Sequence, residues 1–210
     1  MKGLLTPFLL GYFLLIGSAG WLLLTHDKLL LQLTINGLHT SFLDFVMPFI
    51  TWLGDGLIVI PFGIAYVLFV SRKVGWMILF TYLLSALLAQ MGKHIFFPEA
   101  MRPYFYLKTN PDFHKIPDFL YYEFHSFPSG HTATAFAVTS MLALNYSSKG
   151  SIQILLLMLA CLIGFSRTYL SQHFLVDVWA GSIIGILSSF VLWFGLPPSF
   201  LKTSQPYFQK

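Results

Sequence analysis

Long apolar runs separated by short polar breaks make up most of the 210-residue chain. Each run is close to the length that a helix needs to cross about 30 Å of hydrocarbon. Helices are expected because the backbone groups of such a run must find their hydrogen bonds within the segment. The pattern therefore predicts an all-α, polytopic membrane protein with six transmembrane helices, at Leu4–Leu24, Gly56–Ser71, Val74–Met91, Thr132–Ser148, Ser151–Ser166 and Val178–Leu201.

Two connections between these runs are long. In the first, from His26 to Asp55, the amphipathic stretch Lys28–Phe42 predicts a short interfacial helix followed by re-entry into the membrane. The second, Lys93–Ser129, is rich in aromatic residues, which suit the headgroup level. These rings form an interfacial belt, or some of them line an entrance for lipid. Both connections are expected on the outer face.

Loop charges set the expected orientation, because cytoplasmic loops carry an excess of Lys and Arg. With six spans both chain ends lie on one side. The raw counts on the two sides are equal, but the charges on the side of the termini lie in very short loops or tails, where the rule is strongest. We therefore place the termini in the cytoplasm. The two sets are Lys2, Arg72, Lys73, Lys149, Lys202 and Lys210 against Lys28, Lys93, Arg102, Lys108, Lys115 and Arg167.

The start of the chain allows a second interpretation. Lys2, the apolar run and Gly17-Ser18-Ala19 resemble a cleavable signal peptide. The apolar run continues through Leu24, which favours a retained helix. Residues 1–210 are then expected to form a single membrane-embedded domain.

The composition argues against a soluble domain and against a nucleic-acid-binding protein. Only 10% of residues are charged and 56% are hydrophobic, whereas soluble domains carry about 25% charged residues. The formal net charge of +4 is scattered, without the basic cluster of a nucleic-acid-binding protein. The single cysteine, Cys161, lies in an apolar run and is interpreted as packing.

His173 and Asp177 form the most informative polar group. Four residues apart at the start of the last run, they would share one helix face, where a carboxylate can fix the tautomer of an imidazole and free its other nitrogen to attack. Arg167 would point elsewhere on a continuous helix. The three residues meet only if the chain turns near Leu170–Gln172.

Two further groups lie at the same expected membrane face. Ser129 and Gly130 begin the fourth run and form an anion-binding helix start, with His131 in its first turn. Lys93 and Arg102 supply two cations suited to phosphate oxygens. Each group alone is common, but together they provide what transfer of a phosphoryl group to an imidazole requires.

These residues resemble the three signature motifs of the type 2 phosphatidic acid phosphatase family. The motifs are Lys93…Arg102-Pro103, Pro128-Ser129-Gly130-His131 and Ser166-Arg167 followed by His173 and Asp177. The resemblance covers residues 93–177. The first motif departs from the family, whose lysine and arginine are separated by six residues, whereas eight separate Lys93 from Arg102. Either the loop is longer or another residue takes the lysine's role.

The resemblance implies a role for each residue. His173 is the nucleophile that forms a phosphohistidine, Asp177 orients it, and His131 is the general acid and later the base. Phosphate binding falls to Lys93, Arg102, Ser129, Gly130 and Arg167. No metal and no cofactor is implied. A bell-shaped pH profile is expected, because His173 must be neutral while His131 is protonated.

The implied function is a bacterial inner-membrane phosphatase whose site faces the periplasm. Candidate substrates are undecaprenyl pyrophosphate, phosphatidylglycerol phosphate, phosphatidic acid and lipid A phosphates. The alternatives are a lipid-to-lipid phosphotransferase using the same phosphohistidine, and a non-enzymatic membrane transporter or binding protein. A transporter predicts charges near the centres of spans, whereas these gather at span ends. The pattern does not indicate an oligomeric state or which lipid is used.

Overall fold

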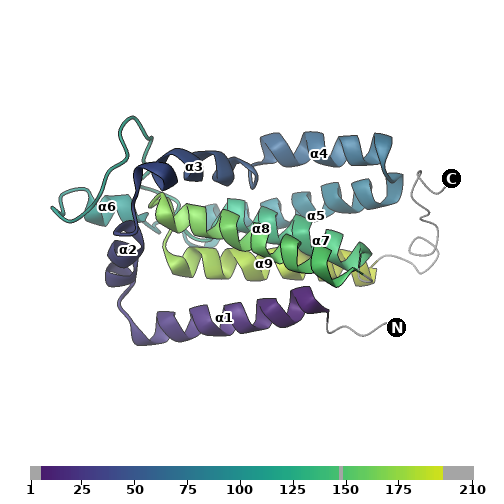
Figure 1. Cartoon of the computed structure of the whole chain (residues 1–210), viewed down its shortest axis with the longest axis horizontal. Helices are drawn as coiled ribbons and strands as arrows, with labels where there is room; N and C mark the ends of the chain where they lie inside the picture. The colour runs from purple at the N-terminus through teal and green to yellow at the C-terminus, as the bar shows by residue number, and fades with distance from the viewer. Residues whose placement is uncertain (1–5, 147–148, 196–210) are drawn as a thin grey trace.

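Helices arranged along one long axis form the body of the protein (Figure 1). The computed structural model describes residues 6–146 and 149–195. Their elements are α1 (Pro7–Thr25), α2 (Lys28–Asn36), α3 (Ser41–Trp52), α4 (Gly56–Phe69), α5 (Arg72–Met91), the π-helix η1 (Gly92–Phe96), α6 (Pro103–Leu107), α7 (Gly130–Asn145), α8 (Gly150–Tyr169) and α9 (Leu175–Gly195).

Helix α7 is the centre of the bundle. Every residue from Thr132 to Ala143 is buried, against α5, α8 and α9. Two glycines of α9 allow the closest approach: a Cβ on Gly181 would lie 2.5 Å from the Ser129 carbonyl oxygen, and one on Gly185 2.4 Å from that of Ala133. This four-residue spacing of small residues is typical of tightly packed membrane helices. It holds the first turn of α7 against the second and third turns of α9.

The six-span prediction is confirmed only in part. Among the described residues, α1, α5 continued through η1, α8 and α9 are long and apolar enough to cross a membrane. The bent pair α3 and α4, which meet at 53°, would make a fifth span. The run expected at Gly56–Ser71 forms a helix of only 14 residues, and the one expected at Thr132–Ser148 a helix of 16. Both are shorter than a complete single-helix span.

Helix boundaries account for these lengths. Asp55 caps the start of α4, and Ser129 caps the start of α7. The side chain of Asn145 turns back to donate to the Met141 carbonyl, and α7 ends there. Many large apolar side chains on the outside of the bundle are exposed, such as Leu24 (86%) and Leu57 (82%). The exterior therefore suits lipid.

Helices α2 and α6 lie at one end of the bundle with the long connections, here called the outer end (Figure 1). The short helix predicted after the first run is α2. The Asp44 carboxylate connects α3 to the second long connection and to α8. It lies 2.8 Å from Nε2 of His114 and accepts a 2.6 Å hydrogen bond from the Tyr169 hydroxyl. Tyr104 stacks on Tyr121. Some aromatic residues of the Lys93–Ser129 connection therefore build its fold.

Helix α1 begins, and α9 ends, at the opposite end of the bundle (Figure 1). The described start of α1 and the described end of α9 thus lie at the same end of the bundle. Lys2, Lys202 and Lys210, used above to assign that side, lie outside the described residues, as do Leu4 and the stretch 196–201 of the last predicted span.

Candidate active site

The turn between α8 and α9 brings Arg167 and His173 together. Ser171 adopts a left-handed conformation (φ 52°), and the backbone N–H groups of Gln172 and His173 both donate to the Arg167 carbonyl, at 3.0 and 3.1 Å. Gln32 of α2 fastens the turn from outside by donating to the Thr168 carbonyl and the Ser171 hydroxyl. The predicted turn at Leu170–Gln172 is confirmed.

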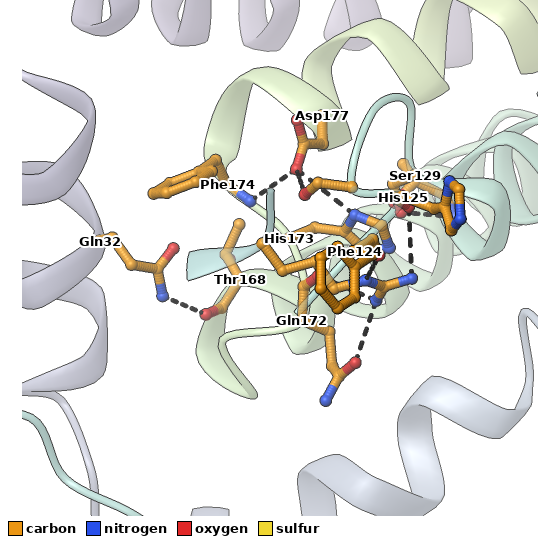
Figure 2. A network of polar contacts seen from close by, with 12 residues as sticks. Gln32, Phe124, His125, Ser129, Thr168, Gln172, His173, Phe174 and Asp177 are labelled. Carbon is orange, nitrogen blue, oxygen red and sulfur yellow. Dashed lines mark hydrogen bonds and ion pairs between the residues drawn. The ribbon is translucent and has the colours of Figure 1, made fainter. Parts of the chain in front are cut away.

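The carboxylate of Asp177 faces His173 and Phe174 (Figure 2). Its Oδ2 lies 3.4 Å from Nδ1 of His173 and accepts hydrogen bonds from the Phe174 backbone N–H (2.9 Å) and the Ser126 hydroxyl (2.5 Å). Both His173 and Asp177 are buried. At 3.4 Å the imidazole is within ion-pair range but makes no well-formed hydrogen bond, so this site has room to tighten when a ligand binds.

His173 was expected on the same helix as Asp177, and this is wrong. His173 lies in the turn before α9, and Asp177 is the third residue of that helix. The reason is the cap: the Asp177 side chain reaches back to the Phe174 N–H, as the third residue of a capping box does. Helix α9 therefore begins after His173, and the pair meets across the cap.

The start of α7 contacts the backbone of Asp177. The Ser129 backbone N–H donates to the Asp177 carbonyl at 3.0 Å, and the Ser129 hydroxyl caps α7 through the Thr132 N–H. Lys93 of η1 lies beside this helix start, since a Cβ on Gly130 would be 3.9 Å from its Nζ. The longer spacing in the first motif does not remove Lys93 from the cluster.

Arg102 makes more structural contacts than predicted. Its Nε donates to the Phe124 carbonyl, and its Nη1 donates to the backbone and side-chain oxygens of Gln172 at 3.0 Å each. Nη2 reaches the His125 carbonyl at 3.4 Å. Arg102 thus joins the outer connection to the α8–α9 turn, in addition to the phosphate contact predicted for it.

Arg167 is buried, and a donor of its guanidinium lacks a partner in the described residues. Its Nη1 donates to the Thr51 hydroxyl at 2.8 Å. In the part of the chain that the structure describes, its Nε–H has no hydrogen-bond partner. A buried guanidinium N–H without a partner is costly, and a bound anion would satisfy it.

The electrostatics keep His173 neutral. Burial, and then the positive charges of Arg167, Arg102 and Lys93, lower the pKa of His173 well below its ordinary value of 6.5. A neutral imidazole retains a lone pair, which a nucleophile requires. The same cations that would bind phosphate thus keep the ring ready to attack.

A cavity of about 380 Å³ lies beside the cluster, between α4, α5 and α7. Leu57, Ile60 and Ala86 are among the residues along its apolar side, and Lys93 and His131 line it as well. Its lining contains none of the aromatic residues of the outer connection. The cavity thus brings apolar side chains and the Lys93–His131 side of the cluster into one space.

Three contacts of the site were missed by the sequence reasoning: Asp55 with His131, Ser126 with Asp177, and Thr51 with Arg167. Each partner lies far away in the chain, and none belongs to a recognised motif. The only local signal was at Asp55, which stands between two glycines. In the described residues, no group of three or more His, Cys, Asp or Glu could hold a metal ion.

Residues 74–199 match the PAP2 superfamily. The undecaprenyl-diphosphatase of Sulfolobus acidocaldarius is 27% identical over 158 residues, which cover 75% of this chain and 72% of that protein. The bacitracin transport permease protein BcrC of Bacillus licheniformis is 34% identical over 87 residues. That match spans 41% of each chain, less than half the length of the relative.

Two solved structures share the fold. The crystal structure of Aquifex aeolicus LpxE superposes with a TM-score of 0.68 at 28% identity, covering 80% of this chain and 94% of that one. The transmembrane PAP2-type phosphatidylglycerolphosphate phosphatase of Bacillus subtilis gives a TM-score of 0.64 at 23% identity, covering 95% of this chain and 99% of that one. The second likeness concerns the fold alone.

Proposed function

Since this chain belongs to the PAP2 superfamily, a family of membrane lipid phosphatases, we propose that it hydrolyses a lipid phosphate through a phosphohistidine on His173. One observation carries the proposal. His173 is buried, its Nδ1 lies 3.4 Å from the Asp177 carboxylate, and its backbone N–H donates to the carbonyl of Arg167, whose buried Nε–H has no partner among the described residues. A phosphate group would complete this arrangement, because it supplies both the acceptor for Arg167 and the electrophile for His173.

The first step forms a phosphorus–nitrogen bond. Asp177 holds the proton on Nδ1 of His173, and the lone pair on Nε2 attacks phosphorus. The bond from phosphorus to the leaving oxygen breaks, its electron pair stays on that oxygen, and His131 supplies the proton. In the second step, water gives a proton to His131 and attacks phosphorus, which releases phosphate and restores His173.

Cations provide the electrostatic stabilisation. Arg167 and Lys93 approach from different elements, and the start of α7 at Ser129 and Gly130 adds backbone N–H groups. Arg102 contributes its charge while holding the outer connection in place. These groups carry out the neutralisation that metal ions provide in other phosphoryl-transfer enzymes. We therefore propose a metal-independent reaction without a cofactor.

The cavity between α4 and α5 suits a lipid substrate. The phosphate would reach Lys93 and His131 while the apolar chain lies along Leu57 and Ile60.

The site is at the outer end, and we propose that this end faces the periplasm at a bacterial inner membrane, with residues 1–210 forming one domain. The substrate candidates remain undecaprenyl pyrophosphate, phosphatidylglycerol phosphate, phosphatidic acid and lipid A phosphates. The relative from Sulfolobus acidocaldarius is an undecaprenyl-diphosphatase.

Exposure favours hydrolysis over transfer to a second lipid. The side chains of His131 and Asp55 are 27% and 37% exposed at the cavity, so water can reach the residue proposed as the base of the second step. The positions of the charges argue against a transporter, because Lys93, Arg102 and Arg167 gather at one end of the bundle and not at the middle of spans.

Phosphate release from a panel of the four lipid classes in detergent micelles tests the proposal, with EDTA present throughout. We expect release from at least one lipid by the intact protein and by His26→Ala, and none by His173→Ala. His26 is a matched control because it lies at the exposed end of α1. Equal release by the intact protein and His173→Ala, or loss of release in EDTA, would refute the proposal.

A further inference from the structure

The turn between α3 and α4 places a carboxylate against the proposed general acid. Asp55 caps α4, with Oδ1 accepting from the Leu57 N–H at 2.8 Å. Its other oxygen, Oδ2, lies 3.3 Å from Nε2 of His131. One oxygen fixes the side chain to its own helix and the second faces the imidazole, so the carboxylate is held in one orientation.

The two flanking glycines let this turn approach α7 and α5. A Cβ on Gly54 would lie 2.8 Å from the His131 carbonyl oxygen and 3.2 Å from the His131 Cβ. A Cβ on Gly56 would lie 2.1 Å from the Tyr82 hydroxyl oxygen. Real Cβ atoms do not tolerate such contacts, so the turn is fitted against His131 through backbone that only glycine permits.

A carboxylate at this point favours the protonated form of His131. His131 must carry a proton to act as a general acid, yet the Lys93 ammonium lies beside Gly130 and opposes a second positive charge next to it. The Asp55 charge acts in the opposite direction to that repulsion, while burial and the charges of Arg167, Lys93 and Arg102 lower the pKa of His131. By accepting from Nε2–H it also decides which ring nitrogen remains for the substrate, as second-sphere carboxylates do for other imidazoles.

We propose that Asp55 is a positioning residue for His131. It accepts a hydrogen bond from Nε2–H and leaves Nδ1–H to donate to the leaving alkoxide. The oxygen that departs from phosphorus keeps the bonding electron pair and takes the Nδ1 proton. The imidazolium becomes a neutral imidazole whose Nε2–H still donates to Asp55. Water later returns a proton to Nδ1. The inference rests on the proposed function and adds a second oriented histidine to it.

Asp55→Asn is the informative variant, because asparagine caps a helix as well as aspartate does while removing the charge. We expect turnover of a lipid phosphate monoester to fall about 10- to 100-fold, part of the 10²- to 10⁴-fold that general acid–base catalysis contributes. The first-turnover burst of 4-nitrophenolate from 4-nitrophenyl phosphate reports the first step alone, and its rate should change less than threefold, since that leaving group departs as an anion and needs no proton.

Asp27→Asn is the matched control. Asp27 caps α2 through the Leu29 and Leu30 N–H groups and has no contact with the site, so both activities should be unchanged. A double-mutant cycle gives a second readout. If Asp55 acts through His131, Asp55→Asn should have no further effect on lipid turnover in a His131→Ala background.

Equal losses on both substrates would overturn the inference, as would losses that multiply in the double variant, because both point to a structural role. His173→Ala, measured alongside, separates the two proposals. If lipid turnover requires His173 but is unchanged in Asp55→Asn, this inference fails alone. If turnover is independent of His173, the proposed function fails with it.

Discussion

Nδ1 of His173 lies 3.4 Å from Oδ2 of Asp177, the oxygen that also caps α9 through the Phe174 N–H. The start of a helix and the orientation of a nucleophile thus depend on one atom. Ser126, from the outer connection, donates to the same oxygen. The carboxylate cannot turn away from His173 without breaking the cap, so the fold keeps it within ion-pair range of the imidazole.

Removing the charge of this carboxylate should therefore reduce turnover more than stability. We expect Asp177→Asn to lower kcat by up to about 10⁴-fold, the loss seen when an orienting aspartate of a triad becomes asparagine. Phosphate release measures the rate and the thermal unfolding midpoint in detergent measures the fold. A loss below threefold with unchanged stability would show that Asp177 does not orient the nucleophile.

The Thr51 hydroxyl should matter through Arg167. Thr51→Val leaves a buried guanidinium N–H unpaired, at a cost of about 1–3 kcal/mol, and frees the side chain to rotate. We expect kcat/KM to fall about tenfold, chiefly through KM. Thr81→Val is the control, because the Thr81 hydroxyl is also buried but binds only its own helix. Equal effects of the two substitutions would argue against a role in phosphate binding.

The acidic limb of the pH profile should reflect the lowered pKa of His173. Burial and the charges of Arg167, Arg102 and Lys93 lower it, so His173 stays neutral as the pH falls through 6.5. The loss of kcat/KM caused by protonation of His173 should thus lie below pH 6.5. In Lys93→Gln, with one fewer positive charge, it should move to higher pH.

The ionisation of the substrate phosphate, at a pKa of about 6, is common to both proteins and cancels in their ratio. An acidic limb of kcat/KM that lies at the same pH in Lys93→Gln and in the intact protein would mean that Lys93 does not act on the group that titrates.

The contact between α7 and α9 should be sensitive to added volume. In Gly185→Ala the new methyl group would meet the Ala133 carbonyl oxygen at 2.4 Å, so the helices must separate. We expect a loss of about 1–3 kcal/mol in stability and a parallel loss of activity. Gly17→Ala in α1 should be neutral or stabilising, because nothing lies within 4 Å of its new methyl group. Unfolding in detergent compares them, and equal stabilities would contradict the packing described for α7 and α9.

Much of the site could be predicted from local patterns. Ser129 caps a helix, His131 follows in its first turn, and the chain turns where Arg167 and His173 required it. These features depend on neighbours within a few residues. The family followed from the same motifs.

The rest depends on contacts that local patterns do not contain. Thr51 lies 116 residues from Arg167, and Ser126 lies 51 residues from Asp177. The sequence allows Asp55 to be predicted as a helix cap. Its second oxygen contacts His131 of α7 only because the α3–α4 turn packs against the start of that helix. The extents of α4 and α7 were wrong because hydropathy does not show where a cap or a bend ends a helix.

The most direct test of the central claim is to trap the phosphorylated enzyme. In His131→Ala, 4-nitrophenyl phosphate labelled with ³²P needs no acid for the first step, while the second step lacks its base, so the intermediate should accumulate. We predict label on the peptide that contains His173, stable in alkali and lost in acid as for a phosphohistidine. No label should appear when His173→Ala is added. Label on another residue, or label that persists without His173, would contradict the account.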